Sequence, residues 1–398
     1  MNYFNRPEEN GISERKKKKS LFHRTAAWLH LYLGIFSSAI LIFVCLTGTI
    51  VVFCDEIIDY FNQDAMYVKE IKNERVPTEI LLENVKAQFP DRFSPSYLIS
   101  YKDPARTVKF NQYSKTDGLR FVYADPYTGR VVKDDGTIYF FFITAHLHNS
   151  LLLGKTGEWI VDISAIIFLI GIITGFILWV PKKWTKATRH KSFLIKTNGT
   201  KKRLNYDLHN VAGFYALSIL LVLTLTGLLI AFKPLSDATV QIFGGDPSHD
   251  WENLMPEYNS NLSFAPMNDA ISDAFAKDSL ATAVQIFFPR KDSATYYGMA
   301  TASQVGLKSY IGSMSFIDKY TSKEITLPES SVIHEKVENA YWMLHMGAWM
   351  GLTGKIITFT GGLIATSLPV TGFIIWWGRR KKKPLFRRKK KTIVNNTF

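Results

Sequence analysis

Four long apolar runs constrain this chain most, because each approaches or exceeds the ~20 residues that cross a bilayer. They cover roughly residues 26–53, 160–180, 211–232 and 356–377, and most charged residues lie between them. A chain of 398 residues with this pattern does not fold around one soluble core, and it is neither disordered nor collagen-like. The first run has no small-x-small cleavage site, so we interpret it as a membrane anchor rather than a signal peptide. The sequence therefore predicts a membrane α-helical bundle of four transmembrane helices.

The basic residues are distributed unevenly along the chain. Of the 48 Lys and Arg, 26 lie before residue 25, within 181–206 or after 377, and these three segments hold only three acidic residues. The positive-inside rule then predicts a multi-pass protein of the bacterial cytoplasmic membrane with both termini and the 181–206 loop in the cytoplasm. Because topology and contacts with anionic lipids account for the net charge of +14, we expect no nucleic-acid partner.

Two internal similarities, each without gaps, indicate that the chain is a tandem repeat. In the first register, Leu29-His30 and Gly34 match Leu208-His209 and Gly213, and Leu46-Thr47-Gly48 matches Leu225-Thr226-Gly227. In the second register, Leu147-His148 matches Leu344-His345, and Gly175-Phe176-Ile177 matches Gly372-Phe373-Ile374. Each half is therefore predicted to consist of a helix, an outward domain and a second helix.

The outward segments are predicted to repeat as well. The first has a helical stretch near 78–88, strand-like runs near 97–101, 107–112 and 120–123, and a turn at Asp125-Pro126-Tyr127-Thr128-Gly129. The second has a helical stretch near 267–275, runs near 283–288, 295–300 and 313–316, and a diverged turn at 318–322. Both indicate a small α+β domain.

The predicted order is a cytoplasmic basic arm (1–25), a span (26–53), an outward domain (54–137), an outer interfacial helix (138–157), a span (158–180), a cytoplasmic basic loop (181–206), a span (207–232), a second outward domain (233–335), a second outer interfacial helix (336–354), a span (355–377) and a cytoplasmic basic tail (378–398).

Two of these motifs carry a resemblance to a known family. The Asp-x-Tyr-Thr-Gly turn at 125–129 and the Leu-His-x-x-x-Gly helix starts at 29–34 and 208–213 resemble the PepSY-associated transmembrane family, over roughly residues 22–380. The resemblance implies that the two outward domains are PepSY-like. It also implies an iron-regulated membrane protein, some relatives of which reduce ferric siderophores with b-type haem.

Four histidines recur in both halves and are the candidate ligands. His30 and His209 fall at the cytoplasmic edge, and His148 and His345 fall at the outer edge. Ionisable residues near apolar spans need a partner, and one imidazole on each side of an iron is bis-His haem ligation. We therefore predict two b-type haems, with Gly34 and Gly213 leaving room beside the ring. The gap between the two levels is expected to be ~30 Å unless the outer segments bend inward.

The other histidines have weaker claims. His146 is a possible alternative ligand, a propionate partner or a surface residue, whereas solvated positions are expected for His23, His190, His249 and His334. Aromatic residues such as Trp28, Tyr32, Trp342 and Trp349 line the haem or form an interfacial belt. Two His per level make an incomplete zinc site, and Cys45 and Cys54 alone provide no Cys-rich metal site.

Three functions remain open at this stage. The first is an oxidoreductase that takes electrons from a cytoplasmic reductant or quinol and reduces an outward ferric chelate, such as a ferric siderophore, with no catalytic residues beyond the haem ligands. The second is a non-redox PepSY protein that binds or regulates a peptide, a peptidase or a chelate. The third is a transporter, although no broken mid-span helix marks a substrate site. A b-type spectrum of the membrane fraction discriminates the first from the others.

Overall fold

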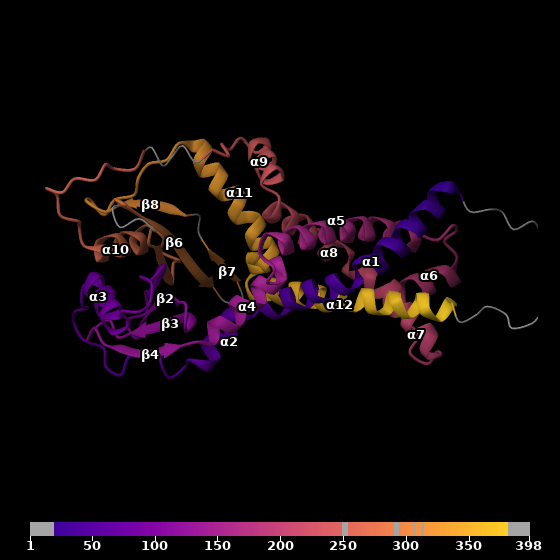
Figure 1. The fold of residues 1–398 in the computed structure, drawn as a ribbon, viewed down its shortest axis with the longest axis horizontal. Helices are drawn as coiled ribbons and strands as arrows, with labels where there is room; N and C mark the ends of the chain where they lie inside the picture. Colours follow the sequence, from indigo (N-terminus) through magenta and orange to yellow (C-terminus); the bar gives the residue numbers. More distant parts are fainter. Residues whose placement is uncertain (1–19, 249–253, 290–293, 306–307, 312–313, 381–398) are drawn as a thin grey trace, which may run out of the picture.

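The molecule is elongated, with a helical bundle at one end and a β-sheet at the other (Figure 1). The computed structural model describes residues 20–248, 254–289, 294–305, 308–311 and 314–380. Most of the predicted basic arm (1–25), most of the basic tail (378–398) and His249 lie outside the described residues.

Four helices of the bundle are long and apolar enough to cross a membrane. They are α1 (Leu21–Val51), α5 (Gly154–Trp179), the run of α7 (Lys201–Asp207), a π-helical turn (Leu208–Ala212) and α8 (Gly213–Ala231), and α12 (Leu352–Arg380). The shortest, α5, has 26 residues. That length corresponds to ~39 Å at ~1.5 Å per residue, more than the ~30 Å of a hydrocarbon core. Large apolar side chains such as Phe36 and Ile173 are exposed on the outside of the bundle, as contact with lipid requires.

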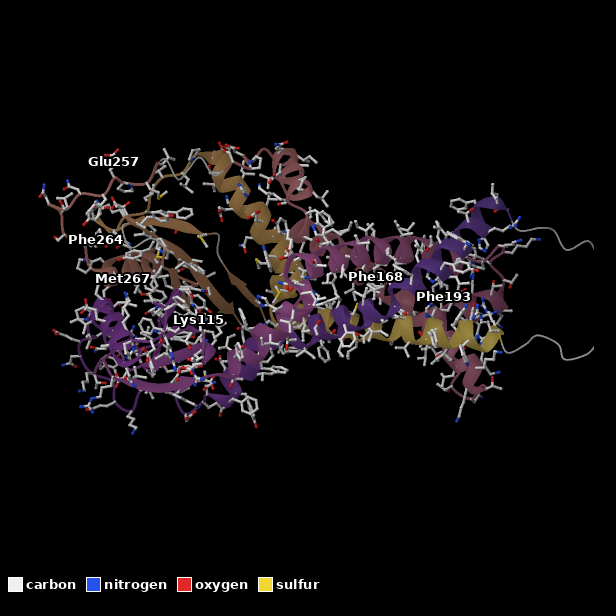
Figure 2. The ribbon with its side chains drawn as sticks, in the orientation of Figure 1. Lys115, Phe168, Phe193, Glu257, Phe264 and Met267 are labelled. Carbon is white, nitrogen blue, oxygen red and sulfur yellow. The ribbon has the colours of Figure 1, made fainter. Side chains whose placement is uncertain are left out.

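The described ends of the chain lie together at the end of the bundle far from the sheet (Figure 1). Helix α6 (Lys186–Phe193) and helix α7 lie at the same end. We call this the loop end, and the opposite end the sheet end. Figure 2 shows Phe193 near the loop end, Phe168 within the bundle and Met267 in the lobe that holds the sheet.

The two segments that were predicted to face outward form one antiparallel sheet. The first contributes β1 (Tyr97–Tyr101), β2 (Val108–Ser114), β3 (Gly118–Ala124) and β4 (Val131–Asp135), and the second contributes β5 (Ala283–Phe287), β6 (Tyr296–Val305), β7 (Lys308–Ile311) and β8 (Ser315–Asp318). The order is β4-β3-β2-β1-β5-β6-β7, and β8 pairs with β6. The prediction of two separate small domains is therefore wrong in this respect, because β1 and β5 pair from Tyr97 opposite Phe287 to Tyr101 opposite Ala283.

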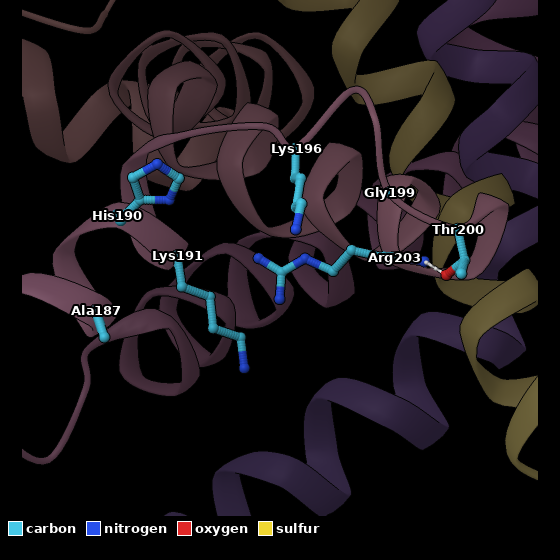
Figure 3. Close-up of a pocket in the computed structure, with 7 residues that line it drawn as sticks. All are labelled: Ala187, His190, Lys191, Lys196, Gly199, Thr200 and Arg203. Carbon is cyan, nitrogen blue, oxygen red and sulfur yellow. Dashed lines mark hydrogen bonds between the residues drawn. The ribbon is translucent and has the colours of Figure 1, made fainter.

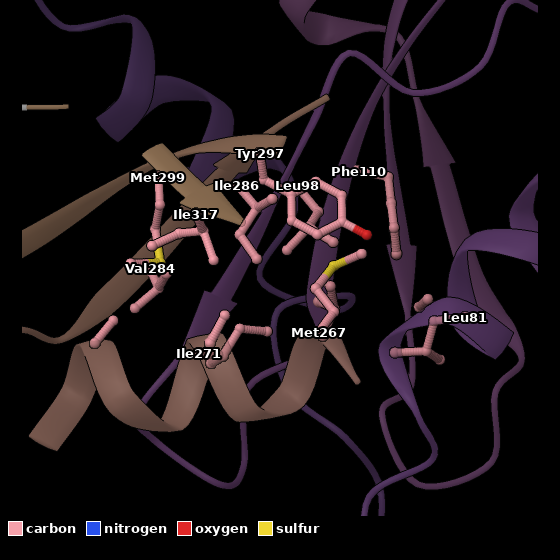
Figure 4. Packing of buried hydrophobic residues seen from close by; sticks show 14 of the residues in the cluster. Leu81, Leu98, Phe110, Met267, Ile271, Val284, Ile286, Tyr297, Met299 and Ile317 are labelled. Atoms are coloured by element: carbon pink, nitrogen blue, oxygen red, sulfur yellow. The ribbon is translucent and has the colours of Figure 1, made fainter. Parts of the chain in front are cut away.

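One hydrophobic core serves both segments. Helix α3 (Thr78–Gln88) and helix α10 (Met267–Lys277) pack on the same face of the sheet. Their buried side chains form a single cluster with residues of β1, β2, β3, β5, β6 and β8 (Figure 4). Asn268 of α10 accepts hydrogen bonds from the backbone and the hydroxyl of Thr78, so the two segments fold as one body.

Helices connect the sheet to the bundle. On the other face of the sheet, α2 (Cys54–Phe61) and α4 (Thr137–Ser150) pack Ile58 and Phe141 against Tyr123. Helix α9 (Lys233–Ile242) and helix α11 (Glu329–Met346) are joined by a hydrogen bond of 3.1 Å between the hydroxyls of Ser236 and Tyr341. Helices α4 and α11 lead from the sheet lobe into the sheet end of the bundle (Figure 1).

Both predicted interfacial helices are broken by a tight turn. The first, predicted over 138–157, ends as α4 at Ser150, and the chain turns through Leu151 and Leu152 with positive φ angles before α5. The second, predicted over 336–354, ends as α11 at Met346, and a 3-10 turn (Ala348–Met350) precedes α12. A Cβ on Gly157 would collide with the carbonyl of Ser150, and one on Gly354 with the carbonyl of Gly347, so glycine is required at both positions.

Candidate functional site

His30 and His209 face each other near the loop end of the bundle. His30 projects from α1, and His209 from the π-helical turn before α8. Their ring centres are 6.1 Å apart, and the ring planes make an angle of 79°. They line a cavity of about 480 Å³ whose walls come from α1, α5, α8 and α12. The sequence prediction that these two residues form a pair therefore agrees with their position.

Each of these rings is held through its Nδ1 atom. The Nδ1 of His30 lies 3.1 Å from the carbonyl oxygen of Gly171, and that of His209 lies 3.1 Å from the carbonyl oxygen of Leu368. The hydroxyls of Thr174 and Thr371 lie at 3.2 and 3.0 Å from the same nitrogens. Because a carbonyl oxygen only accepts, Nδ1 carries the proton in the neutral ring, and Nε2 keeps a free lone pair.

His148 and His345 form a second pair near the sheet end. They come from the last turns of α4 and α11, and their ring centres are also 6.1 Å apart. The Nδ1 of His148 lies 2.8 Å from the carbonyl oxygen of Val44, and that of His345 lies 3.1 Å from the carbonyl oxygen of Leu223. Both rings are half-buried between the helices, and with Nδ1 facing a carbonyl each neutral ring keeps its lone pair on Nε2.

The partners of the histidines recur in the two registers of the sequence similarity. Gly171 and Leu368, which accept from the first pair, are equivalent positions in the second register. Val44 and Leu223, which accept from the second pair, are equivalent positions in the first register. Within each pair, the two rings therefore have carbonyl partners at equivalent positions; the ring angle is 79° in the first pair and 50° in the second.

Four glycines that the sequence analysis did not single out as site residues lie against the rings. A Cβ on Gly48 would come 2.6 Å from His148, and one on Gly227 would come 3.1 Å from His345. A Cβ on Gly175 would come 3.1 Å from His30, and one on Gly372 would come 3.2 Å from His209. Each histidine therefore packs on the bare backbone of a neighbouring helix. These glycines were present in the repeated motifs, so the sequence similarity contained the signal that identifies them.

The two predicted glycines lie elsewhere in the same site. Gly34 and Gly213 line the cavity beside His30 and His209, one turn after each histidine. A Cβ on Gly34 would meet nothing within 4 Å, whereas one on Gly213 would touch Leu368 at 3.4 Å. Neither position contacts a ring, and whether they leave room for a haem stays a prediction.

The two pairs are closer along the bundle than the ~30 Å predicted from the sequence. His148 hydrogen-bonds at Val44 of α1, the helix that also carries His30. The helical stretch from His30 to Val44 is ~21 Å long at ~1.5 Å per residue, instead of the ~30 Å expected for a ligand at the outer edge. The turns at Leu151 and Gly347 allow α4 and α11 to enter the bundle and account for the difference.

The remaining histidines are not part of a facing pair in the described residues. The Nδ1 of His146 lies 2.9 Å from the carbonyl oxygen of Phe142 in its own helix. His190 is exposed, as predicted. The prediction that His334 is solvated is wrong, because its side chain is buried and its Nδ1 lies 2.8 Å from the carbonyl oxygen of Asp246. His23 is half-buried at the edge of the cavity.

The aromatic lining of the cavity differs from the residues suggested by sequence. Trp28, Tyr32, Trp342 and Trp349 are about half exposed, and the cavity is lined instead by Phe168, Phe176, Trp179, Phe214, Phe373 and Trp376. The exposed set matches the alternative interpretation, a belt at the membrane interface. Within the described part of the chain, no three His, Cys, Asp or Glu side chains gather as a zinc or non-haem iron site would need.

These features define a class of protein: a multi-pass membrane protein with four candidate membrane-spanning helices and an α+β lobe. The family model described as "PepSY-associated TM region" matches residues 27–379, and the chain belongs to this family. No curated protein matches the chain.

Proposed function

We propose that the protein is a di-haem b-type oxidoreductase of the bacterial cytoplasmic membrane, and that it reduces an extracytoplasmic ferric chelate such as a ferric siderophore. The observation that supports this most strongly is the geometry of the two histidine pairs. Two imidazoles that bind one metal ion at ~2 Å each have ring centres ~6 Å apart. Both pairs have 6.1 Å.

The residues fit haem better than a bare metal ion. Each pair offers two Nε2 lone pairs and no third ligand among the described residues, which suits an iron whose other ligands come from a macrocycle. The loop-end pair opens into an apolar cavity of about 480 Å³, within the size range of cofactor sites. His30 and His209 would hold one haem, and His148 and His345 the other.

The role of the protein chain in this proposal is to fix the rings. Haem, when bound, supplies the reversible one-electron chemistry that moves electrons between the two membrane faces. The carbonyls of Gly171, Leu368, Val44 and Leu223 fix the tautomer and orientation of the four rings. The glycines at 48, 175, 227 and 372 allow each ring to come close to the backbone of a neighbouring helix.

The direction of electron flow follows from the basic segments. The described ends of the chain and the basic 181–206 loop lie at the loop end, so we assign that end to the cytoplasm and the sheet lobe to the outside. Electrons from a cytoplasmic reductant or quinol would then enter at the loop-end pair and leave at the sheet-end pair. The ferric chelate would be reduced on the outer side, where ferrous iron is released from its oxygen ligands.

The duplication is part of the proposal. The same two registers relate the histidines and their carbonyl partners, which supports two tandem helix–α/β–helix repeats. Each repeat supplies half of the joined sheet, and we assign the two halves as PepSY-like domains.

Vesicles test the proposal directly. The purified chain is inserted into liposomes loaded with dithionite, ferric citrate is added outside, and ferrous iron is trapped with a chromogenic chelator. We expect reduction with the wild type, none with His209→Ala or His345→Ala, and wild-type activity with the control His146→Ala, which changes a histidine in the same helix as His148. A colourless protein without a b-type spectrum, or reduction that survives both ligand variants, would favour the non-redox binding or regulatory alternative.

A further inference from the structure

A cleft at the loop end, outside the histidine site, is lined by basic side chains from two elements. It has a volume of about 550 Å³ and is formed by α6, the linker after it and the start of α7. Figure 3 shows the side chains of Lys191, Lys196 and Arg203 around one space, with His190 at its edge. The surrounding loop, 181–206, has nine Lys and Arg and no acidic residue.

A buried carboxylate fixes the position of two walls of the cleft. Asp207 is fully buried, and its Oδ2 accepts from the Nε of Arg203 at 2.7 Å and from the backbone nitrogen of Lys196 at 3.2 Å. The backbone nitrogen of Arg203 donates to the hydroxyl of Thr200 at 3.3 Å. The cleft is therefore built in advance rather than formed by free loops.

The charged ends in the cleft are available to a ligand. Arg203 uses only its Nε for Asp207, and its two terminal nitrogens have no hydrogen-bond partner within the described ranges. The same holds for the Nζ of Lys196, and the Nζ of Lys191 lies over the ring of Tyr206 at 5.5 Å. One carboxylate against two lysines and an arginine leaves the cleft with an excess of positive charge.

We propose that this cleft binds a phosphate-bearing ligand. The two free terminal nitrogens of an arginine can donate hydrogen bonds to two oxygens of one phosphate group. A lysine ammonium adds a compact positive charge beside those oxygens. The cleft is open to solvent, and its volume admits more than a single phosphate group. Two sources have this chemistry: the headgroup of an anionic phospholipid and a soluble nucleotide.

The cleft adjoins the histidine cavity. Tyr206, which Lys191 contacts, also lines the cavity that contains His30 and His209, and Asp207 precedes His209 by one intervening residue. If the ligand is a nucleotide reductant, the cleft is the place where the electron donor docks. That role rests on the proposed function, whereas the binding of phosphate does not.

Binding of inorganic pyrophosphate to the full-length protein in detergent tests the proposal. Calorimetry should show saturable binding to the wild type and at least tenfold weaker binding to the Lys191→Gln/Lys196→Gln variant. The Lys201→Gln/Lys202→Gln variant is the matched control, because these exposed lysines lie on the same loop and do not line the cleft. It should bind pyrophosphate within twofold of the wild type.

A second arm identifies the source of the phosphate. In nanodiscs that contain phosphatidylglycerol, loss of pyrophosphate binding relative to phosphatidylcholine nanodiscs identifies a lipid headgroup in the cleft, and unchanged binding identifies a soluble ligand. No binding to the wild type, or equal weakening in both double variants, overturns the proposal. Because no haem is needed for this measurement, its failure is distinguishable from failure of the proposed redox function.

Discussion

The contact between Gly48 and His148 is the strictest packing requirement at the histidine site. In Gly48→Ala, the new Cβ would lie 2.6 Å from Cε1 and 2.8 Å from Nδ1 of His148. To reach an ordinary contact distance of ~3.5 Å, the ring has to move by roughly 0.9 Å. That movement disrupts the hydrogen bond of 2.8 Å from Nδ1 to the carbonyl of Val44.

The expected consequence is local. Loss of one hydrogen bond costs about 1 kcal/mol, and loss of a contact that orients a metal ligand typically lowers metal affinity about 10–100-fold. Alanine also favours a helix over glycine by about 1 kcal/mol, so the fold should persist. We therefore expect Gly48→Ala to retain the haem at His30 and His209 and to lose or weaken the haem at the sheet end.

The assay is the haem-to-polypeptide ratio during titration of purified apoprotein with haem. Gly378→Ala is the control, because it is also in a membrane-spanning helix and its Cβ would meet nothing within 4 Å. Gly227→Ala, with a contact of 3.1 Å to His345, should have an intermediate effect. Equal haem affinity in Gly48→Ala and Gly378→Ala would refute the reasoning.

Three further predictions concern the topology, the sheet lobe and an ion pair between α2 and α12. Single cysteines introduced within 60–135 should react with an impermeant reagent in intact cells, and those within 185–205 only after permeabilisation; the reverse result would invert the proposed orientation. Burial alone would raise the pKa of Asp134, but hydrogen bonds from Arg92 and Arg120 hold the pKa below its usual value. The contribution of these contacts to the free energy of unfolding should be complete above pH ~4 and should be lost as the pH falls through the lowered pKa. In thermal unfolding experiments over the same pH range, Arg92→Met should lose less stability than the wild type does. Lys355→Met removes an ion pair of 2.8 Å with Glu56 and should lower the free energy of unfolding by about 1 kcal/mol or less in a denaturation assay, and an unchanged value would show that the pair contributes nothing.

The local elements of the lobe were predictable because their signals are local. The helix over 78–88 and the strand over 97–101 have the predicted bounds, since a short apolar period and flanking Pro and Ser residues define them. The pairing of β1 with β5 was not predictable in the same way. This pairing places Tyr97 opposite Phe287. The sequence of neither strand indicates which distant strand it pairs with, because two membrane spans separate them in the chain.

The candidate site also has features that the sequence predicts and features that it does not. The internal similarity identified His30, His148, His209 and His345, because a duplicated sequence marks the positions that share an environment. It did not reveal the depth of the second pair, which depends on the positive φ angles at Leu151 and Gly347. The ring contacts of the glycines were also missed, because the direction in which a side chain packs depends on how neighbouring helices cross.

The amount of haem bound by the purified wild-type protein tests the central proposal most directly. A pyridine haemochrome assay with a quantified polypeptide concentration gives the ratio. Two facing histidine pairs, each with ring centres 6.1 Å apart, predict two b-type haems per chain. A ratio of one haem per chain would contradict the claim that both pairs bind haem. A protein without haem would contradict the proposed function.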